Sequence, residues 1–207
     1  MYGTTTSVQT RMTLCVLQVA SSPTLSVLWE NQTMSTNPES CPDCGFVWDG
    51  VSRSDAIEGI NDSIEAFIGV IEDASEMALV RPESKRWSIV EYASHVRDVL
   101  LSLRERTIIA SILDEPTGTP IFRDERVNLG FYSLDSLDDV TDELAFAAGL
   151  LSKTIATLPA GFENRPIKYS PVTPLVVTIG WMAAQAFHEA SHHLGDAREN
   201  LRLLTTD

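Results

Sequence analysis

Apolar residues recur at three- and four-residue steps along four stretches of the chain, and no comparable stretch alternates as a strand would. The first stripe, which predicts a helix from about residue 54 to 78, consists of Ile57, Ile60, Ile64, Phe67 and Ile71. Amphipathic helices of this length bury their stripes most simply against one another. The pattern therefore predicts an all-α fold, a four-helix bundle.

The second helix has the sharpest start signal. In the string WSIVE, Ser88 and Glu91 have the spacing of a capping box, in which each side chain accepts a hydrogen bond from the other residue's backbone N–H. A long connection, 114–135, follows this helix, so one crossover is expected between helices two and three. Thr173–Pro174 has the residue types of an N-cap and a first-turn proline, which predicts the start of a fourth helix that reaches at least His193.

The N-terminal part of the chain differs in composition from the bundle. Residues 1–33 are rich in Ser and Thr and almost free of charge, which predicts a disordered leader. A mis-assigned start is the alternative, because the string MSTNPESCPDC, which begins at Met34, resembles a natural N-terminus. A secretory signal is disfavoured, since the apolar stretch is short and interrupted. Residues 34–53 form a Cys-containing lead-in segment, which Phe46, Val47 and Trp48 are expected to anchor against the bundle, and the bundle occupies 54–200.

Charge and cysteine content limit the function classes. The chain of 207 residues has 15 basic and 29 acidic residues, a net charge of -14, and no basic cluster. Nucleic acid and anionic membrane surfaces are therefore not expected as partners. The longest apolar run is too short to span a bilayer comfortably. The three cysteines are too few for a secreted disulfide scaffold, which indicates a reducing compartment, and we expect the cytoplasm.

The string HEASHHLGD, near the end of the chain, contains the H-E-x-x-H pattern of zinc proteases. His188 and His192 are one helical turn apart, so their imidazoles project side by side and can share an ion. The extended protease pattern through Gly195 requires a histidine where Arg198 stands, and arginine cannot bind zinc. The sequence thus disfavours a protease and leaves two interpretations of the pair, a metal site of another kind or a chance pairing of a core and a surface histidine. His193 lies about 100° further around the helix and is expected to be a surface or capping residue.

A third ligand must come from elsewhere in the chain, and His95 is the one histidine left. It lies in the apolar register of the second helix and should face the bundle interior. A buried imidazole needs a polar partner, and a cation shared with His188 and His192 would supply one. Three neutral imidazoles and one open position are typical of a catalytic metal site. We therefore expect a divalent metal at these three histidines.

The strings WSIVEYASHVRDVL and AFHEASHHLGD resemble the DinB-like superfamily of metal-binding four-helix bundles, over about residues 54–198. The family's helix-two histidine and following aspartate match His95 and Asp98, and its H-x-x-x-H matches His188 and His192. The resemblance implies zinc or nickel as the metal. It also implies thiol chemistry, because characterised branches include mycothiol and bacillithiol S-transferases and mycothiol-dependent maleylpyruvate isomerases. The lead-in SCPDCGFVWD is similar to actinobacterial-type members, which favours mycothiol.

The expected function is therefore a metal-dependent S-transferase that joins a low-molecular-weight thiol of the mycothiol type to a small electrophile. A hydrolase that uses metal-bound water and a non-catalytic metal-binding stress protein are the two competing interpretations. The catalytic residues are not identified beyond Asp98 and Glu189, which are candidates for orienting the imidazoles. Trp181 is a candidate to line the pocket or to lie in the core, and a homodimer is left open.

The cysteine pair Cys41 and Cys44 forms a C-P-D-C-G string that is similar to one half of a zinc ribbon. A four-cysteine site needs a second pair that the chain lacks, and Cys15 lies in the leader. The favoured interpretations are a simple turn or an unfilled half-site. The same string is also compatible with a half-site completed across a dimer and with a redox disulfide.

Overall fold

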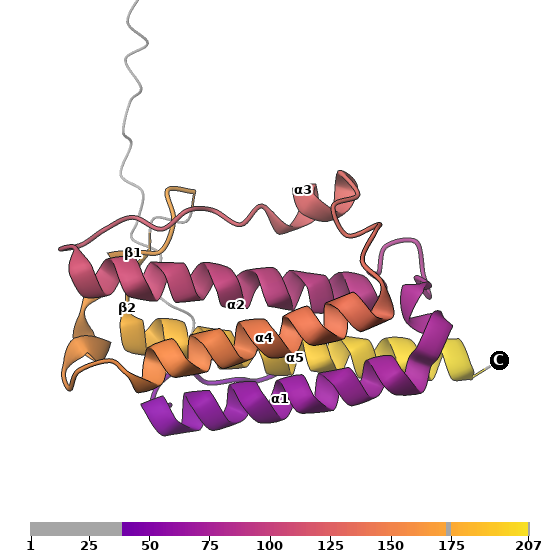
Figure 1. Cartoon of the computed structure of the whole chain (residues 1–207), viewed down its shortest axis with the longest axis horizontal. Coiled ribbons are helices and arrows are strands. Elements are labelled where there is room, and N and C mark those ends of the chain that lie inside the picture. The colour runs from indigo at the N-terminus through magenta and orange to yellow at the C-terminus, as the bar shows by residue number, and fades with distance from the viewer. Residues whose placement is uncertain (1–38, 173–174, 207) are drawn as a thin grey trace, which may run out of the picture. The chain divides into compact units, whose positions relative to one another are not determined.

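The computed structural model describes residues 39–172 and 175–206 (Figure 1). The predicted leader, residues 1–33, lies outside the described residues. The elements in chain order are α1 (Arg53–Ala74), the 3-10 helix η1 (Ser75–Leu79), α2 (Ile89–Ile112), α3 (Arg123–Asn128), α4 (Leu137–Ala156), the 3-10 helix η2 (Phe162–Asn164), β1 (Pro166–Lys168), β2 (Val176–Thr178) and α5 (Ile179–Thr205). Four of the helices are long and form the predicted four-helix bundle.

Side chains that cap the helices fix where all four long ones begin, and at α4 the Ser136 hydroxyl accepts from the backbone N–H of Asp139. The predicted capping box at the start of α2 is confirmed, since the Ser88 hydroxyl accepts from the Glu91 backbone and the Glu91 carboxylate accepts from the Ser88 backbone. An equivalent box of Ser52 and Asp55 begins α1. Thr178 caps α5 by accepting from the backbone N–H of Trp181. Each cap satisfies backbone donors that the first helical turn leaves without partners.

The helices do not pack in chain order. Both α1 and α2 pack against α4 and α5, whereas α1 and α2 contact each other only slightly and lie on one diagonal of the bundle. Figure 1 shows α1 and α5 running in one direction and α2 and α4 in the other. This arrangement requires the long crossover that the sequence predicts between α2 and α4, and the crossover contains the short helix α3. The core consists of the facing apolar stripes, with Phe67, Leu100, Leu144 and Met182 among its fully buried side chains.

The predicted start of the last helix at Thr173–Pro174 is wrong, because α5 begins at Ile179. The residues just before it form β2, which pairs with β1 as a two-stranded antiparallel sheet. Val177 lies opposite Ile167 and both side chains are buried, so two β-branched residues favour strand pairing here over helix. The helix also runs well past His193, to Thr205.

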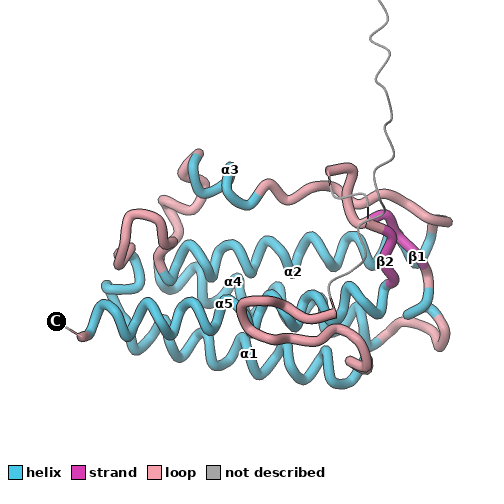
Figure 2. Tube along the Cα trace, turned by 180° about the vertical axis from the view of Figure 1, so that it is seen from behind, coloured by secondary structure: helices cyan, strands magenta, loops and turns pink. Residues whose placement is uncertain are grey.

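The lead-in loop, residues 39–52, lies across α1 and α5 on the face that Figure 2 shows. Its predicted aromatic anchor is confirmed for two of its residues. Phe46 packs edge-on against Phe187 of α5 with ring centroids 5.1 Å apart, and the indole of Trp48 donates a 2.7 Å hydrogen bond to Gln185. A Cβ at Gly59 of α1 would lie 2.4 Å from the Phe187 ring, so a glycine there leaves room for that ring.

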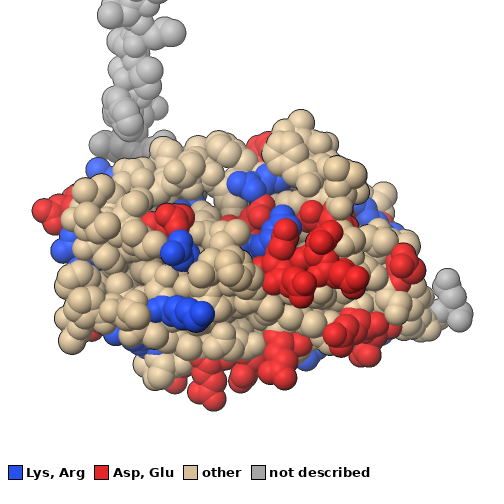
Figure 3. Space-filling view, viewed as in Figure 1, with Lys and Arg blue, Asp and Glu red and all other residues tan. Residues whose placement is uncertain are grey.

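Acidic side chains gather in a patch on the face that Figure 3 shows, while lysine and arginine are scattered. This distribution agrees with the net charge of -14. Among the described helices, none combines the length and the apolar character that crossing a membrane requires.

Candidate metal centres

The histidine-rich string lies in the middle of α5, where it contains two pairs of donors with the same spacing. His188 and His192 form one pair, and Glu189 and His193 form the other. A one-residue step turns the helix by about 100°, so the two pairs point in different directions from neighbouring positions. Each pair meets different residues from other parts of the chain, and two clusters of donors that share no residue result. A third group on α5, His192, His193 and Asp196, shares one histidine with each of them.

The first cluster, here called the inner triad, consists of His95 from α2 and Glu189 and His193 from α5. The two imidazoles are buried, with 2% and 9% of their side chains exposed, and Glu189 is 19% exposed. One carboxylate oxygen, Oε2 of Glu189, lies 3.5 Å from Nε2 of His95 and 3.5 Å from Nε2 of His193. The three donor atoms therefore point to one place inside the bundle.

This geometry fits a shared cation. Nitrogen and oxygen ligands bound at about 2.0 to 2.2 Å around a tetrahedral ion lie about 3.3 to 3.6 Å from one another. The 3.5 Å separations fall in that range and are long for hydrogen bonds. Three protein donors also leave a fourth position open, as in catalytic zinc sites. The inner triad is therefore a suitable donor set for a divalent cation.

Asp196 orients one imidazole of the inner triad. Its Oδ2 lies 2.9 Å from Nδ1 of His193, so that the other ring nitrogen faces the triad. Burial lowers the pKa of His193, but the contacts with Asp196 and Glu189 outweigh it and raise the pKa to about 9, so a cation that binds Nε2 would have to displace a proton. Burial raises the pKa of Glu189, yet its contacts with His193 and His95 outweigh that effect and hold the pKa well below the usual range. A carboxylate that holds an imidazole in this way is common behind metal-bound histidines.

A small pocket of about 70 Å³ adjoins the inner triad and is lined by two of its members, His95 and Glu189. The pocket lies between α2 and the crossover, and its other lining residues are Val99, Ser102, Leu103, Arg106, Ile121, Arg123 and Tyr169. Arg106 is only 4% exposed and lies over the ring of Tyr169, with its guanidinium carbon 4.4 Å from the ring centroid. The pocket thus combines apolar walls with two guanidinium groups.

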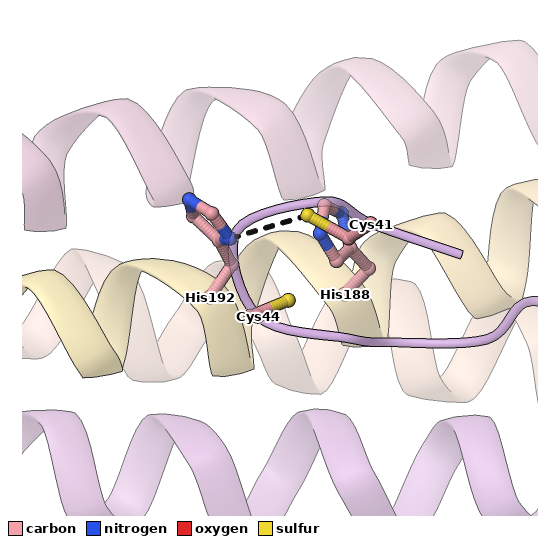
Figure 4. Close-up of side chains that lie close together, drawn as sticks. All are labelled: Cys41, Cys44, His188 and His192. Carbon is pink, nitrogen blue, oxygen red and sulfur yellow. Dashed lines mark hydrogen bonds between the residues drawn. The ribbon is translucent and has the colours of Figure 1, made fainter. Parts of the chain in front are cut away.

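The second cluster, here called the outer tetrad, consists of Cys41 and Cys44 from the lead-in loop and His188 and His192 from α5 (Figure 4). One donor atom from each residue lies within 4.8 Å of the other three. Burial lowers the pKa of His188, which favours the neutral imidazole that metal binding needs. Burial raises the pKa of the Cys44 thiol, and a hydrogen bond from the Phe46 backbone lowers it in part.

The structure does not bring the three predicted metal ligands together. His188 and His192 do lie side by side, but they meet the two cysteines, whereas His95 faces the interior as predicted and meets Glu189 and His193. The prediction that His193 lies on the surface or caps the helix was wrong, because its side chain is buried beside His95. Glu189, which was expected to orient the imidazoles, is itself one of the three candidate metal ligands of the inner triad. The sequence contains a signal for this second pair of ligands, since Glu189 and His193 have the same four-residue spacing as His188 and His192.

Two further predictions about side chains need correction. Asp98 does not orient an imidazole. It accepts hydrogen bonds from Arg97, Arg126 and Tyr132, so it ties the crossover to α2. Trp181 does not line the pocket beside the donors. It packs against the core, the other position expected for it, and lines a larger cavity of about 920 Å³ beside Trp48, which no residue of either donor cluster lines.

Comparisons with known proteins identify the family. The family model described as the DinB superfamily matches residues 51–197. No match is found among curated proteins. The chain is similar in fold to a solved structure, YfiT from Bacillus subtilis, described as "a probable metal-dependent hydrolase with an unusual four-helix bundle topology". That likeness has a TM-score of 0.69 and 14% identity, and covers 83% of this chain and 94% of the other. Since the family model matches most of the chain, including both the α2 histidine and the α5 donors, this protein belongs to the DinB superfamily.

Proposed function

We propose that this protein is a metal-dependent enzyme that holds a divalent cation at the inner triad and acts on a small anionic electrophile in the adjoining pocket. The observation that carries the proposal is the equal 3.5 Å approach of both imidazole Nε2 atoms to one oxygen of Glu189 at the edge of that pocket. A cation in this position would supply Lewis acidity, which lowers the pKa of a thiol or a water molecule beside it.

Arg106 supports the choice of an anionic substrate. Its side chain is buried, its Nε has no hydrogen-bond partner, and no carboxylate of the described residues lies within ion-pair distance of it. One terminal nitrogen donates to the backbone oxygen of Thr119, which fixes the direction of the guanidinium. The guanidinium contacts the Thr119 carbonyl and the Tyr169 ring but no carboxylate of the described residues, and a buried charge without an opposite charge is costly, so an anion in the pocket would relieve that cost. A carboxylate or a phosphate can accept two parallel hydrogen bonds from a guanidinium, and a carboxylate is the smaller of the two.

The inner triad and Arg106 would therefore have separate roles. Glu189 and the two imidazoles hold the cation, and Asp196 keeps His193 in the orientation that directs Nε2 toward it. Arg106 and Arg123 hold the anionic end of the electrophile at the pocket wall. The apolar lining formed by Val99, Leu103 and Ile121 excludes water from the rest of the pocket.

We propose a low-molecular-weight thiol of the mycothiol type as the nucleophile, because the resemblance to thiol-dependent branches of the family supports it. A pocket of about 70 Å³ admits only the reacting ends of the two substrates, so the bulk of such a thiol would lie outside it. A reducing cytoplasm, without nucleic acid or membrane as a partner, suits this chemistry. Water is the second candidate nucleophile, since two imidazoles and one glutamate form the donor set of several zinc hydrolases.

The test uses protein purified without a histidine tag and loaded with zinc or nickel. One assay offers mycothiol and monochlorobimane, then small carboxylate electrophiles, and the other offers small carboxylate-bearing esters and amides without thiol. Metal-dependent conjugation supports the transferase, and thiol-independent cleavage supports hydrolysis instead. Metal bound at the inner triad with neither reaction would overturn the proposal and leave a non-catalytic metal-binding protein.

A matched pair of variants assigns any activity to the inner triad. Glu189→Gln keeps the shape of the side chain but removes a charged donor, and Glu199→Gln makes the same change further along α5, where the carboxylate contacts Arg202 on the surface. Activity should be lost in the first variant and kept in the second. Equal activity in both would contradict the assignment.

A further inference from the structure

The outer tetrad has the ligand spacing of a compact zinc site. Its cysteines are separated by two residues and its histidines by three, which matches the C-x2-C and H-x3-H spacings of structural zinc sites. The two halves come from segments 151 positions apart, as measured between Cys41 and His192. Figure 4 shows the loop passing over α5 so that the thiols and imidazoles converge.

His188 shows most directly that a partner belongs at this place. Its side chain is buried, and neither Nδ1 nor Nε2 has a hydrogen-bond partner. Buried polar atoms in native proteins nearly always have partners, and a ring with two unpartnered nitrogens is a marked exception. The rings of Phe46 and Trp48 lie 5.2 and 4.8 Å from its centroid and shield it from water. A cation bound to one of these nitrogens would satisfy it.

The distances agree with tetrahedral coordination. Sγ of Cys41 lies 3.8 Å from Nδ1 of His192. Around a tetrahedral zinc ion, with bonds of about 2.3 Å to sulfur and about 2.0 Å to nitrogen, these two atoms would lie about 3.5 Å apart. A movement of a few tenths of an ångström would therefore suffice.

The backbone of the lead-in loop holds the two thiols on one side. The carbonyl of Cys41 accepts from the N–H of Gly45 at 2.8 Å, and the N–H of Cys41 donates to the carbonyl of Phe46 at 2.8 Å. Gly45 has a φ of 74°, a conformation that glycine adopts without strain. This tight turn, together with the aromatic anchor on α5, places the cysteines over His188 and His192.

We propose that the outer tetrad is a closed structural zinc site, separate from the inner triad, which fastens the lead-in loop to α5. Four protein donors complete a tetrahedral shell and leave no position for a substrate. Neither the pocket beside the inner triad nor the large cavity beside Trp48 is lined by a tetrad residue. Thiolate and imidazole donors favour zinc over harder cations such as magnesium. The protein would thus bind two cations per chain.

The two sites are linked through Asp196. One of its oxygens lies 2.9 Å from Nδ1 of His193 and 3.7 Å from Nε2 of His192. The Asp196 carboxylate is therefore near one proposed ligand of each cation, His193 in the inner triad and His192 in the outer tetrad. Because His192 would use its opposite nitrogen, Nδ1, for zinc, binding at the outer tetrad leaves this link in place.

The first test measures zinc directly on protein purified under reducing conditions without a histidine tag. In a Cys15→Ser background, which leaves only the tetrad thiols, a mercurial reagent should release one equivalent of zinc as two thiols react, and a zinc-binding dye should report it. Release of no zinc, or recovery of Cys41 and Cys44 as a disulfide under these conditions, would overturn the proposal.

Cobalt provides a spectroscopic test that does not depend on activity. The wild-type protein and Glu189→Gln should both show the near-ultraviolet charge-transfer band of thiolate bound to cobalt, whereas Cys44→Ser, which keeps only the Cys41 thiolate, should show a clearly weaker band. Cys44 is exposed, so this substitution should leave the helical circular dichroism unchanged. Cobalt bound without the thiolate band in the wild-type protein would contradict the site even if the inner triad is active.

Discussion

The inner triad and the outer tetrad occupy adjacent positions on one helix but have opposite chemical character. The inner triad has three donors, a carboxylate among them, and faces a pocket with a buried guanidinium. The outer tetrad has four donors, two of them thiols, and aromatic rings cover its His188. Helical geometry alone separates them, because a one-residue step directs the second pair of donors toward other neighbours. One six-residue string, HEASHH, can therefore serve two metal sites.

The largest effect is expected from Glu189→Gln, a substitution that should abolish metal binding at the inner triad and leave the outer tetrad intact. Glu189→Gln should reduce catalytic turnover to background and lower the metal content from two equivalents to one, because the inner triad loses its charged donor while the outer tetrad is untouched. Elemental analysis and activity assays of the same preparation check both outcomes. Loss of both cations would show that the clusters form one site.

Arg106→Gln should lower kcat/KM for an anionic substrate about 10- to 100-fold, corresponding to about 1.5 to 3 kcal/mol for hydrogen bonds to a charged group. The metal content should stay at two equivalents, since Arg106 is not a donor. Arg104→Gln is the control and should behave as the wild type, because Arg104 lies on the same helix but pairs with Glu105 and does not line the pocket. Equal kinetics for the two variants would remove the argument for an anionic substrate.

Asp196→Asn should weaken the inner site more than the outer one. Loss of a carboxylate behind a metal-bound imidazole typically reduces metal affinity about 10- to 100-fold, and the 2.9 Å contact is with His193. The contact with His192 is longer, at 3.7 Å, so the outer tetrad should lose less. Competition titrations with a chelating dye can resolve the two affinities. A larger loss at the outer tetrad would reverse the assignment of Asp196.

Stability should report mainly on the outer tetrad. Cys44→Ser should lower Tm by about 4 to 8 °C, which for a domain of this size corresponds to about 2 kcal/mol, because the lead-in loop is no longer fastened to α5. A chelator should lower the Tm of the wild-type protein by more than that of the variant, as measured by calorimetry. Identical chelator effects on the two proteins would argue against a structural role.

The smallest expected effect concerns the leader. Because residues 1–33 lack both charge and an apolar stripe, a chain beginning at Met34 should keep both cations and melt at the temperature of the full chain. A decrease in Tm of more than about 4 °C, on the order of 1 to 2 kcal/mol, would show that the leader contributes to the fold.

Local signals in the sequence predicted the bundle well. The apolar stripes and the Ser88–Glu91 capping box depend on spacing along a single helix, which the sequence states directly. The start of α5 was misjudged because Thr173–Pro174 fits a helix start by residue type, while the pairing of Val177 with Ile167 depends on a segment elsewhere in the chain.

The metal donors were identified only in part, for a similar reason. The sequence indicated that His188 and His192 share a face, but it did not indicate which neighbours that face meets. Whether His95 faces His188 and His192 or the neighbouring pair, Glu189 and His193, depends on how α5 is rotated about its axis relative to α2. That rotation is determined by packing between helices and cannot be read from the sequence. The cysteines were expected to need other cysteines, whereas the chain offers histidines from its last helix.

The separation of 151 positions between Cys41 and His192 also has a consequence for biosynthesis. The two cysteines leave the ribosome before the first helix of the bundle, and the two histidines leave it with the last. A zinc ion shared by these residues could be captured with full affinity only after α5 had docked against α1. Until then the chain would present a reactive pair of thiols. Only a fully folded chain would therefore bind this zinc ion, and truncated or misfolded chains would be distinguishable by the free thiols of Cys41 and Cys44.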